Sequence, residues 1–181
     1  MKRSHKITVP ILSLSLIVIG GYIVYILETS NFHTITPAEA YRSAQLSDKK
    51  LEYYIKQNHI KSILNLRGGS SDMQWYRDEI SMSAKYKVTH YDVTLSSSRE
   101  PSTDDIKKII EIFKSAPRPI LIHCKAGADR SGLVAAMWKV FVDKEPKSEA
   151  KKQLSIFFGH IPVGGTYAMD HFFYKWNPQV Q

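Results

Sequence analysis

Residues 120–134 read ILIHCKAGADRSGLV, and this stretch decides the fold of the 181-residue chain. It opens with a short apolar run typical of a buried strand, and residues 132–142 that follow have the pattern of an apolar helix. The small residues Ala126, Gly127 and Ala128 allow the loop between them to curl, so that backbone N–H groups point at one centre. Because the dipole of the following helix acts at the same place, the stretch predicts an anion-binding loop.

Two side chains give this loop a chemistry. Arg130 offers a planar fork of donors for two oxygens of a phosphoryl group. Cys124 lies between the strand and the helix, and both helix N-termini and nearby cations favour the thiolate form of a cysteine. Since a thiolate is a nucleophile at neutral pH, we expect the loop both to hold a phosphate and to attack it.

Outward from this loop, strands alternate with helices. The predicted strands cover residues 60–66, 87–95 and 119–123. The predicted helices cover residues 47–57, 72–85, 103–114, 132–142, 148–158 and 168–176. This alternation predicts an α/β domain in which helices flank a mainly parallel central sheet.

Composition narrows the classes of function. The length suits about one domain, and a single cysteine excludes an intrachain disulfide and a cysteine-based zinc finger. The formal net charge of +8 favours an acidic partner. Because no stripe of basic and aromatic residues accompanies that charge, we expect no nucleic-acid partner. His33, His90, His160 and His171 have no metal-ligand spacing, so we predict no metal site. We also predict no cofactor.

Residues 7–27 form an uncharged run of 21 residues, ITVPILSLSLIVIGGYIVYIL. At about 1.5 Å per residue, a helix of this length spans about 30 Å, the thickness of a bilayer core. A cleaved signal peptide has a shorter apolar core of about 7–15 residues, and a buried soluble helix rarely lacks a polar face over such a length. We therefore predict an uncleaved signal anchor, with those two readings as the alternatives.

The charges around the run predict its orientation. Lys2, Arg3 and Lys6 precede it, and no Lys or Arg follows it before Arg42. Positive charge favours the cytoplasmic side, so the rest of the chain is predicted to be periplasmic or extracellular. The predicted parts are a cytoplasmic N-terminus (1–6), a transmembrane helix (7–27), a linker (28–39) and a catalytic domain (40–178).

The pattern HC-x5-RSG over residues 123–132 matches the HCxxGxxR(S/T)G signature of protein tyrosine phosphatases. The chain therefore resembles this cysteine-dependent superfamily, and its short length is similar to that of the dual-specificity branch. Residues 41–45 (YRSAQ) and 63–67 (ILNLR) resemble segments of small dual-specificity-like domains, and residues 99–101 (REP) resemble the atypical plant and fungal group. The resemblance covers residues 40–175 and implies a dual-specificity-like phosphatase fold.

The resemblance implies a role for each residue of the loop. Cys124 would attack phosphorus and form a phosphocysteine, while Arg130 would bind the equatorial oxygens and stabilise the transition state. Ser131 would hydrogen-bond the thiolate and assist its departure, and His123 would order the loop. The phosphate-binding N–H groups would be those of Lys125, Ala126, Gly127, Ala128, Asp129 and Arg130. No metal is needed for this chemistry.

The general acid stays open at this point. The superfamily usually takes an aspartate about 30 residues before the cysteine, which points near Asp92, inside a predicted strand. Glu100 lies in the loop that follows that strand. Asp129 resembles the loop aspartate of the HCxxGxDR variant of some bacterial lipid and protein phosphatases, where it is a proposed acid. We favour Asp129, then Glu100, with Asp92, Asp104 and Asp105 as further candidates.

The predicted function is the hydrolysis of phosphate monoesters. Because the domain is predicted to lie beside a bilayer, the candidate substrates are phospholipids, phosphoproteins and small phosphate esters, and the membrane itself is a partner through the N-terminal helix. A catalytically inactive phosphate-binding module and a rhodanese-type sulfurtransferase are the alternatives for the same loop. The RSG at residues 130–132 suits a phosphatase better than a sulfurtransferase.

Four further side chains are predicted to be structural. Arg42 and Arg67 are expected to form ion pairs within the fold. His160 and His171 lie in a sequence rich in phenylalanine, and we expect them in the core or in the wall of a pocket.

Overall fold

The computed structural model describes residues 5–178, and its centre is one mixed five-stranded sheet with the strand order β1-β2-β5-β3-β4. The strands are β1 (His33–Thr36), β2 (Ala40–Ser43), β3 (Ser62–Asn65), β4 (Thr89–Asp92) and β5 (Ile120–His123). Strands β2, β5, β3 and β4 run parallel, and β1 is antiparallel to β2 at one edge. The predicted α/β class is confirmed, with a mixed sheet.

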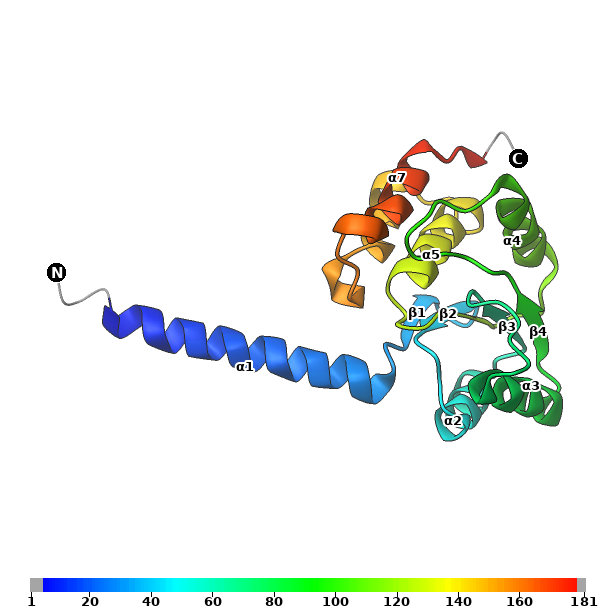
Figure 1. Cartoon of the computed structure of the whole chain (residues 1–181), viewed down its shortest axis with the longest axis horizontal. Helices are drawn as coiled ribbons and strands as arrows, with labels where there is room; N and C mark the ends of the chain where they lie inside the picture. Colours follow the sequence, from blue (N-terminus) through cyan, green and yellow to red (C-terminus); the bar gives the residue numbers. More distant parts are fainter. Residues whose placement is uncertain (1–4, 179–181) are drawn as a thin grey trace.

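Helices cover both faces of the sheet (Figure 1). On one face lie α2 (Asp48–Asn58) and α3 (Gln74–Tyr86), and on the other lie α4 (Thr103–Ser115), α5 (Asp129–Phe141) and α7 (Tyr167–Lys175). Each face has its own apolar core. Ile109, Phe113 and Trp138 are buried in the core that α4 and α5 share, and Leu51 and Ile63 are buried in the core beneath α2.

Strand β5 is the centre of the sheet, and this explains its sequence. All four of its residues are buried, because β2 and β3 flank it and helices cover both faces. The register pairs His123 with both Ser43 and Asn65, so three parallel strands end at one edge. In open parallel sheets, ligands bind at the carboxyl ends of the strands, and the loop after β5 leaves the sheet at this edge.

Two predictions about the elements of the domain are wrong. The predicted linker at 28–39 contains β1, which pairs with β2 and therefore belongs to the domain. The single helix predicted over 148–158 is broken into α6 (Lys147–Ala150), η1 (Lys151–Gln153) and η2 (Ile156–Phe158). The chain leaves helical geometry at Leu154 and Ser155, where Leu154 enters the core.

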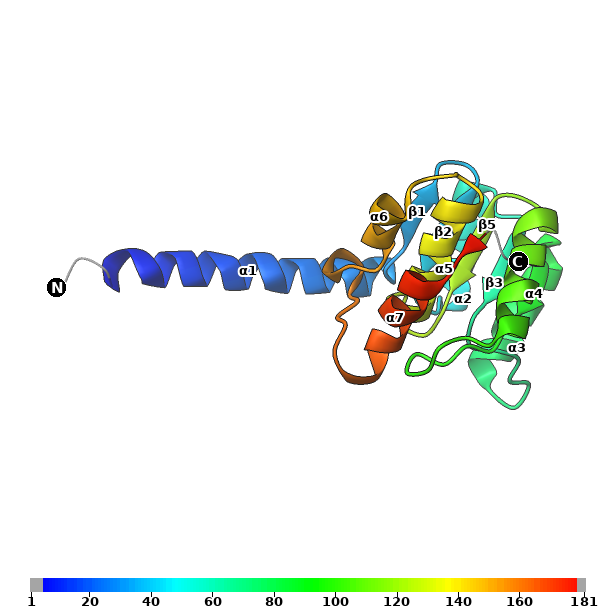
Figure 2. The ribbon, with the colours of Figure 1, turned by 90° about the horizontal axis from the view of Figure 1, so that it is seen from above.

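Helix α1 (His5–Thr29) extends away from the domain (Figure 2), and the hydroxyl of Tyr22 donates a hydrogen bond to the carbonyl of Phe157. Within the residues that the structure describes, no helix is long and apolar enough to cross a membrane. The structure thus gives the transmembrane helix predicted over 7–27 no support. Residues 1–4 of the predicted cytoplasmic N-terminus lie outside the described residues.

Candidate active site

The predicted nucleophile lies at the edge where the parallel strands end. Cys124 follows β5 directly, and α5 begins at Asp129, so the loop joins a strand to the N-terminus of a helix as expected. The Cys124 side chain is buried, and its Sγ lies 3.4 Å from Oγ of Ser131 in the first turn of α5. The structure thus brings together the two residues that the resemblance assigned to the thiolate and its hydrogen bond.

Four consecutive carbonyls of this loop, those of residues 125–128, accept hydrogen bonds from donors in residues 31–45. The pairs are Gln45 N to Lys125 O (3.2 Å), Asn31 Nδ2 to Ala126 O (3.1 Å), Arg42 Nη2 to Gly127 O (2.9 Å) and Arg42 Nη2 to Ala128 O (3.0 Å). In a trans peptide the N–H points opposite to the C=O. The N–H groups of residues 126–129 therefore face away from these donors, and successive N–H groups on one side form an anion-binding nest.

Arg42 is the main support of this nest. Its side chain is fully buried, and it also donates from Nη1 to the carbonyl and the side-chain oxygen of Gln153, at 2.7 and 3.0 Å. Burial lowers the pKa of Arg42 to about 10, although the negative charges of Cys124 and Asp129 oppose that shift. The predicted ion pair is wrong: Arg42 binds backbone carbonyls, because the curled loop turns them toward it.

Arg130 has a side-chain donor without a hydrogen-bond partner in the described part of the chain. Its Nη1 donates to the carbonyl of Leu95 at 3.2 Å and lies 3.4 Å from that of Leu66. Its Nε is buried and has no hydrogen-bond partner within the described part of the chain. A buried donor without a partner is rare in folded proteins. Here it fits an arginine that receives a phosphate oxygen from a ligand.

A cavity of about 400 Å³ opens beside the loop. It is lined by Arg67, Gly69, Ser70, Asp72, Met73, Trp75, Lys125 and Arg130. Arg67 stacks on Trp75, with its guanidinium carbon 3.5 Å from the ring centroid, and donates to Gln45 Oε1 at 2.9 Å. Burial and the charge of Arg130 lower the pKa of Arg67. The predicted structural ion pair is wrong here too, because Arg67 faces the cavity.

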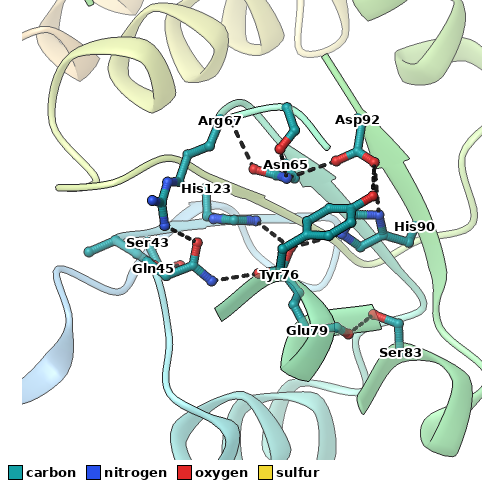
Figure 3. A network of polar contacts seen from close by, with 12 residues as sticks. Ser43, Gln45, Asn65, Arg67, Tyr76, Glu79, Ser83, His90, Asp92 and His123 are labelled. Atoms are coloured by element: carbon teal, nitrogen blue, oxygen red, sulfur yellow. Dashed lines mark hydrogen bonds and ion pairs between the residues drawn. The ribbon is translucent and has the colours of Figure 1, made fainter. Parts of the chain in front are cut away.

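The other side of the loop rests on a buried polar network around Glu79 (Figure 3). Oε1 of Glu79 lies 3.1 Å from Nε2 of His123 and 2.8 Å from Nε2 of His90, and Oε2 accepts from Gln45 at 2.7 Å. Burial would raise the pKa of Glu79, but the charge of His123 and these hydrogen bonds outweigh it and lower the pKa. The network fixes the ring of His123, the residue before the nucleophile.

Three of the candidate acids are already occupied. Asp92 uses both carboxylate oxygens, accepting from Tyr76 at 2.5 Å and from Asn65 at 2.7 Å. Asp105 forms a capping box with Ser102 at the start of α4. Glu100 is hydrogen-bonded to His171, and that bond and the nearby Lys175 lower its pKa.

The remaining candidates differ in position. Asp104 lies in the first turn of α4 with an exposed side chain, 3.9 Å from Nζ of Lys107. Asp129 belongs to the nucleophile loop, and its Oδ1 lies 2.7 Å from Nδ1 of His160. Nε2 of the same ring lies 2.7 Å from Oδ2 of Asp170. The sequence thus placed Asp129 at the loop but missed its partner.

The two histidines expected in the core or in a pocket wall are both paired with carboxylates. His160 is buried between Asp129 and Asp170, and His171 is about half exposed beside Glu100. Burial lowers the pKa of His160, but its two carboxylate partners outweigh burial and raise the pKa. No local pattern could have revealed these pairs, because their members are 10 to 71 residues apart.

Comparison with known families agrees with this geometry. Residues 27–160 match the family described as PTP-NADK, DSP-PTPase phosphatase fused to NAD+ kinase. The chain belongs to this family. It is therefore a phosphatase of the cysteine-dependent, dual-specificity-like superfamily, as its loop signature predicted. Among curated proteins no significant match is found.

Several solved phosphatases share the fold of this DSP-PTPase family member. TpbA from P. aeruginosa is 18% identical with a TM-score of 0.64, over 84% of this chain and 89% of that chain. The catalytic core of Siw14 from S. cerevisiae is 22% identical with a TM-score of 0.65, over 81% and 85%. PTPMT1 is 13% identical with a TM-score of 0.61, over 80% and 94%. At these identities the likeness concerns the fold.

Proposed function

We propose that this phosphatase hydrolyses phosphate monoesters through a phosphocysteine at Cys124. The observation that carries the proposal is the outward binding of the four loop carbonyls at residues 125–128 by donors from residues 31–45. It turns the loop N–H groups toward the opposite side, where three equatorial phosphoryl oxygens require donors. The unpaired Nε of Arg130 adds a charged donor to the same site.

In the first step the Cys124 thiolate forms an S–P bond while the P–O bond to the leaving group breaks, and the leaving oxygen takes a proton. In the second step a water oxygen forms a P–O bond, the S–P bond breaks, and the thiolate returns with inorganic phosphate as product. Ser131 Oγ, 3.4 Å from the sulfur, stabilises the departing thiolate. Positioning and charge stabilisation account for most of the catalysis in phosphoryl transfer.

The lining of the cavity favours substrates with additional negative charge. Arg67, Lys125 and Arg130 bring three positive side chains to one opening, against the single carboxylate of Asp72. One related structure contains TpbA with phosphotyrosine, and another contains Siw14, a PP-IP phosphatase, with citrate. We propose for this chain a phosphate monoester with a second anionic group, carried by a lipid, a protein or a small molecule.

We also propose, from the sequence, that the uncharged run at residues 7–27 holds the chain at a membrane with the catalytic domain outside the cytoplasm. Leu, Ile and Val side chains along α1 are more than half exposed, among them Leu14, Ile17 and Leu27. Covering such side chains with an apolar medium is worth about 1.5–3 kcal/mol each. A domain tethered in this way would meet lipid phosphates at high effective concentration.

The nucleophile is tested by Cys124→Ser in the full chain. We expect this variant to lose hydrolysis of p-nitrophenyl phosphate while it still binds vanadate, because the nest and Arg130 stay in place. The unsubstituted enzyme, assayed on phosphotyrosine peptides, phospholipid vesicles and sugar phosphates, then ranks the substrate classes. Turnover by Cys124→Ser at the rate of the unsubstituted protein would exclude the phosphocysteine mechanism, and vanadate binding without hydrolysis by the unsubstituted protein would favour the inactive module.

A further inference from the structure

A buried histidine links the nucleophile loop to helix α7. His160 is 1% exposed, and each of its ring nitrogens lies 2.7 Å from a carboxylate oxygen, of Asp129 on one side and Asp170 on the other. With both carboxylates ionised, each ring nitrogen donates a hydrogen bond and the ring is an imidazolium. With two carboxylates around one cation, the trio of Asp129, His160 and Asp170 carries a net charge of −1.

Asp129 keeps one oxygen available for proton transfer. His160 holds Oδ1, and within the described residues Oδ2 has no hydrogen bond to the protein. The Asp129 side chain is 21% exposed, so it is partly open to solvent. By contrast, Asp92 uses both of its oxygens, Asp105 caps a helix, and Glu100 is held ionised by His171.

Asp170 balances the positive charge that His160 places beside Asp129. A lone imidazolium beside Asp129 would hold that carboxylate ionised, and so unable to donate a proton. Because Asp170 already balances the charge of His160, one added proton on Oδ2 of Asp129 makes the trio neutral.

We propose that His160, fixed by Asp170, is the positioning residue that holds Asp129 as the proton donor to the leaving group. The inference rests on the proposed phosphatase function. Oδ2 of Asp129 gives its proton to the leaving oxygen as the P–O bond breaks, and takes a proton from the attacking water as the S–P bond breaks. His160 keeps both of its protons throughout, and no further reactant is needed.

The test compares two leaving groups in the full chain. General-acid assistance is typically worth 10²–10⁴-fold for a poor leaving group, and p-nitrophenolate needs little of it. We therefore expect Asp129→Asn to lower kcat/KM for an alkyl phosphate about 10²-fold or more, and for p-nitrophenyl phosphate less than about tenfold. His160→Phe should show the same selective loss, and the double variant should lose no more than Asp129→Asn alone.

The matched control is His171→Phe, which breaks the other histidine–carboxylate pair of α7, with Glu100. It should affect both substrates equally. If His160→Phe does not fold, Asp170→Asn serves in its place. It keeps the ring beside Asp129 but removes the carboxylate that fixes the ring and balances its charge, so it should still give the selective loss. Equal losses on both substrates in the soluble His160 or Asp170 variant, or a selective loss in His171→Phe, would overturn the proposal. Cys124→Ser tests the phosphatase function separately. It should be inactive on both substrates whether or not His160 positions Asp129.

Discussion

Arg42 determines how the phosphate loop is presented, although it lies 82 residues before Cys124 and outside the loop signature. Its guanidinium is fully buried and binds Gly127, Ala128 and Gln153. Replacement by methionine keeps the bulk and removes these donors. We expect Arg42→Met to lower the free energy of unfolding by about 3 kcal/mol, since several bonds to a charged group are lost and buried carbonyls stay unpaired. Chemical denaturation measures this loss.

Vanadate binding measures the effect of Arg42→Met on the nest, and we expect it to weaken at least about tenfold, the equivalent of one charged hydrogen bond. The control is Arg67→Met, whose side chain faces the cavity and supports no loop carbonyl. Its unfolding free energy should change by less than about 1 kcal/mol. A loop that binds vanadate normally in Arg42→Met would show that the carbonyls do not need this donor.

His160 makes the unfolding free energy depend on pH, and its two carboxylate partners determine the direction of that dependence. Burial lowers its pKa, but Asp129 and Asp170 outweigh burial, so the folded-state pKa is above the ordinary value of about 6.5. A raised histidine pKa stabilises the fold fully below that ordinary value, and the contribution is lost as pH rises through the folded-state pKa. We expect the contribution of His160 to the unfolding free energy to fall over that window. In Asp170→Asn the fall should be smaller, since one partner charge is gone; equal profiles from pH 6 to 9 would contradict this.

At the scale of an element, the loop between β5 and α5 requires glycine at position 127. Gly127 has φ +72°, and a Cβ there would lie 2.5 Å from the backbone nitrogen of Ala44 and 2.7 Å from the carbonyl carbon of Ser43. We expect Gly127→Ala to lower kcat/KM at least about tenfold, because the loop must shift away from β2. We also expect it to lower the unfolding free energy by about 1–2 kcal/mol, because alanine must adopt a left-handed backbone. Steady-state kinetics and thermal unfolding measure the two effects.

Gly164→Ala is the control, because Gly164 also has a positive φ (+60°) but a Cβ there would meet nothing within 4 Å. We expect Gly164→Ala to lose about 1–2 kcal/mol of unfolding free energy, because alanine must adopt the left-handed backbone there, and to keep its activity. Equal activity in the two alanine variants would mean that the close approach to β2 does not position the loop.

The elements that the sequence predicted are those that local pattern determines. The β5-loop-α5 unit is read from one apolar run, one group of small residues and one helix, all adjacent in the chain. The break between residues 147 and 158 has no such local cause: Gln153 is fixed by Arg42, 111 residues earlier. For the same reason the partner of Asp129 could not be predicted, since His160 reaches it from beyond that break.

At the scale of the whole molecule, alternating strands and helices were sufficient for the α/β class but not for the strand order. The sequence gives no sign that β1 and β2 pair at the edge beside β5, since both are only four residues long and lie in a polar stretch. The Glu79 network was also missed, because a carboxylate within a helical pattern is usually on the solvated face. Its burial becomes evident only when α3 is packed against His90 of β4 and His123 of β5.

The position of the chain relative to a membrane is the whole-molecule property on which substrate access depends. Lys2, Arg3 and Lys6 precede the uncharged run at residues 7–27, and positive charge is retained on the cytoplasmic side. We expect a reporter fused after Gln181 to be active outside the cytoplasm and the full chain to sediment with membranes. Replacing the three basic residues by glutamate is the matched control, and it should reduce the external signal because the orientation signal is removed. A reporter active only in the cytoplasm, or a chain recovered wholly in the soluble fraction, would contradict the tether and leave phosphoproteins and small esters as the accessible substrates.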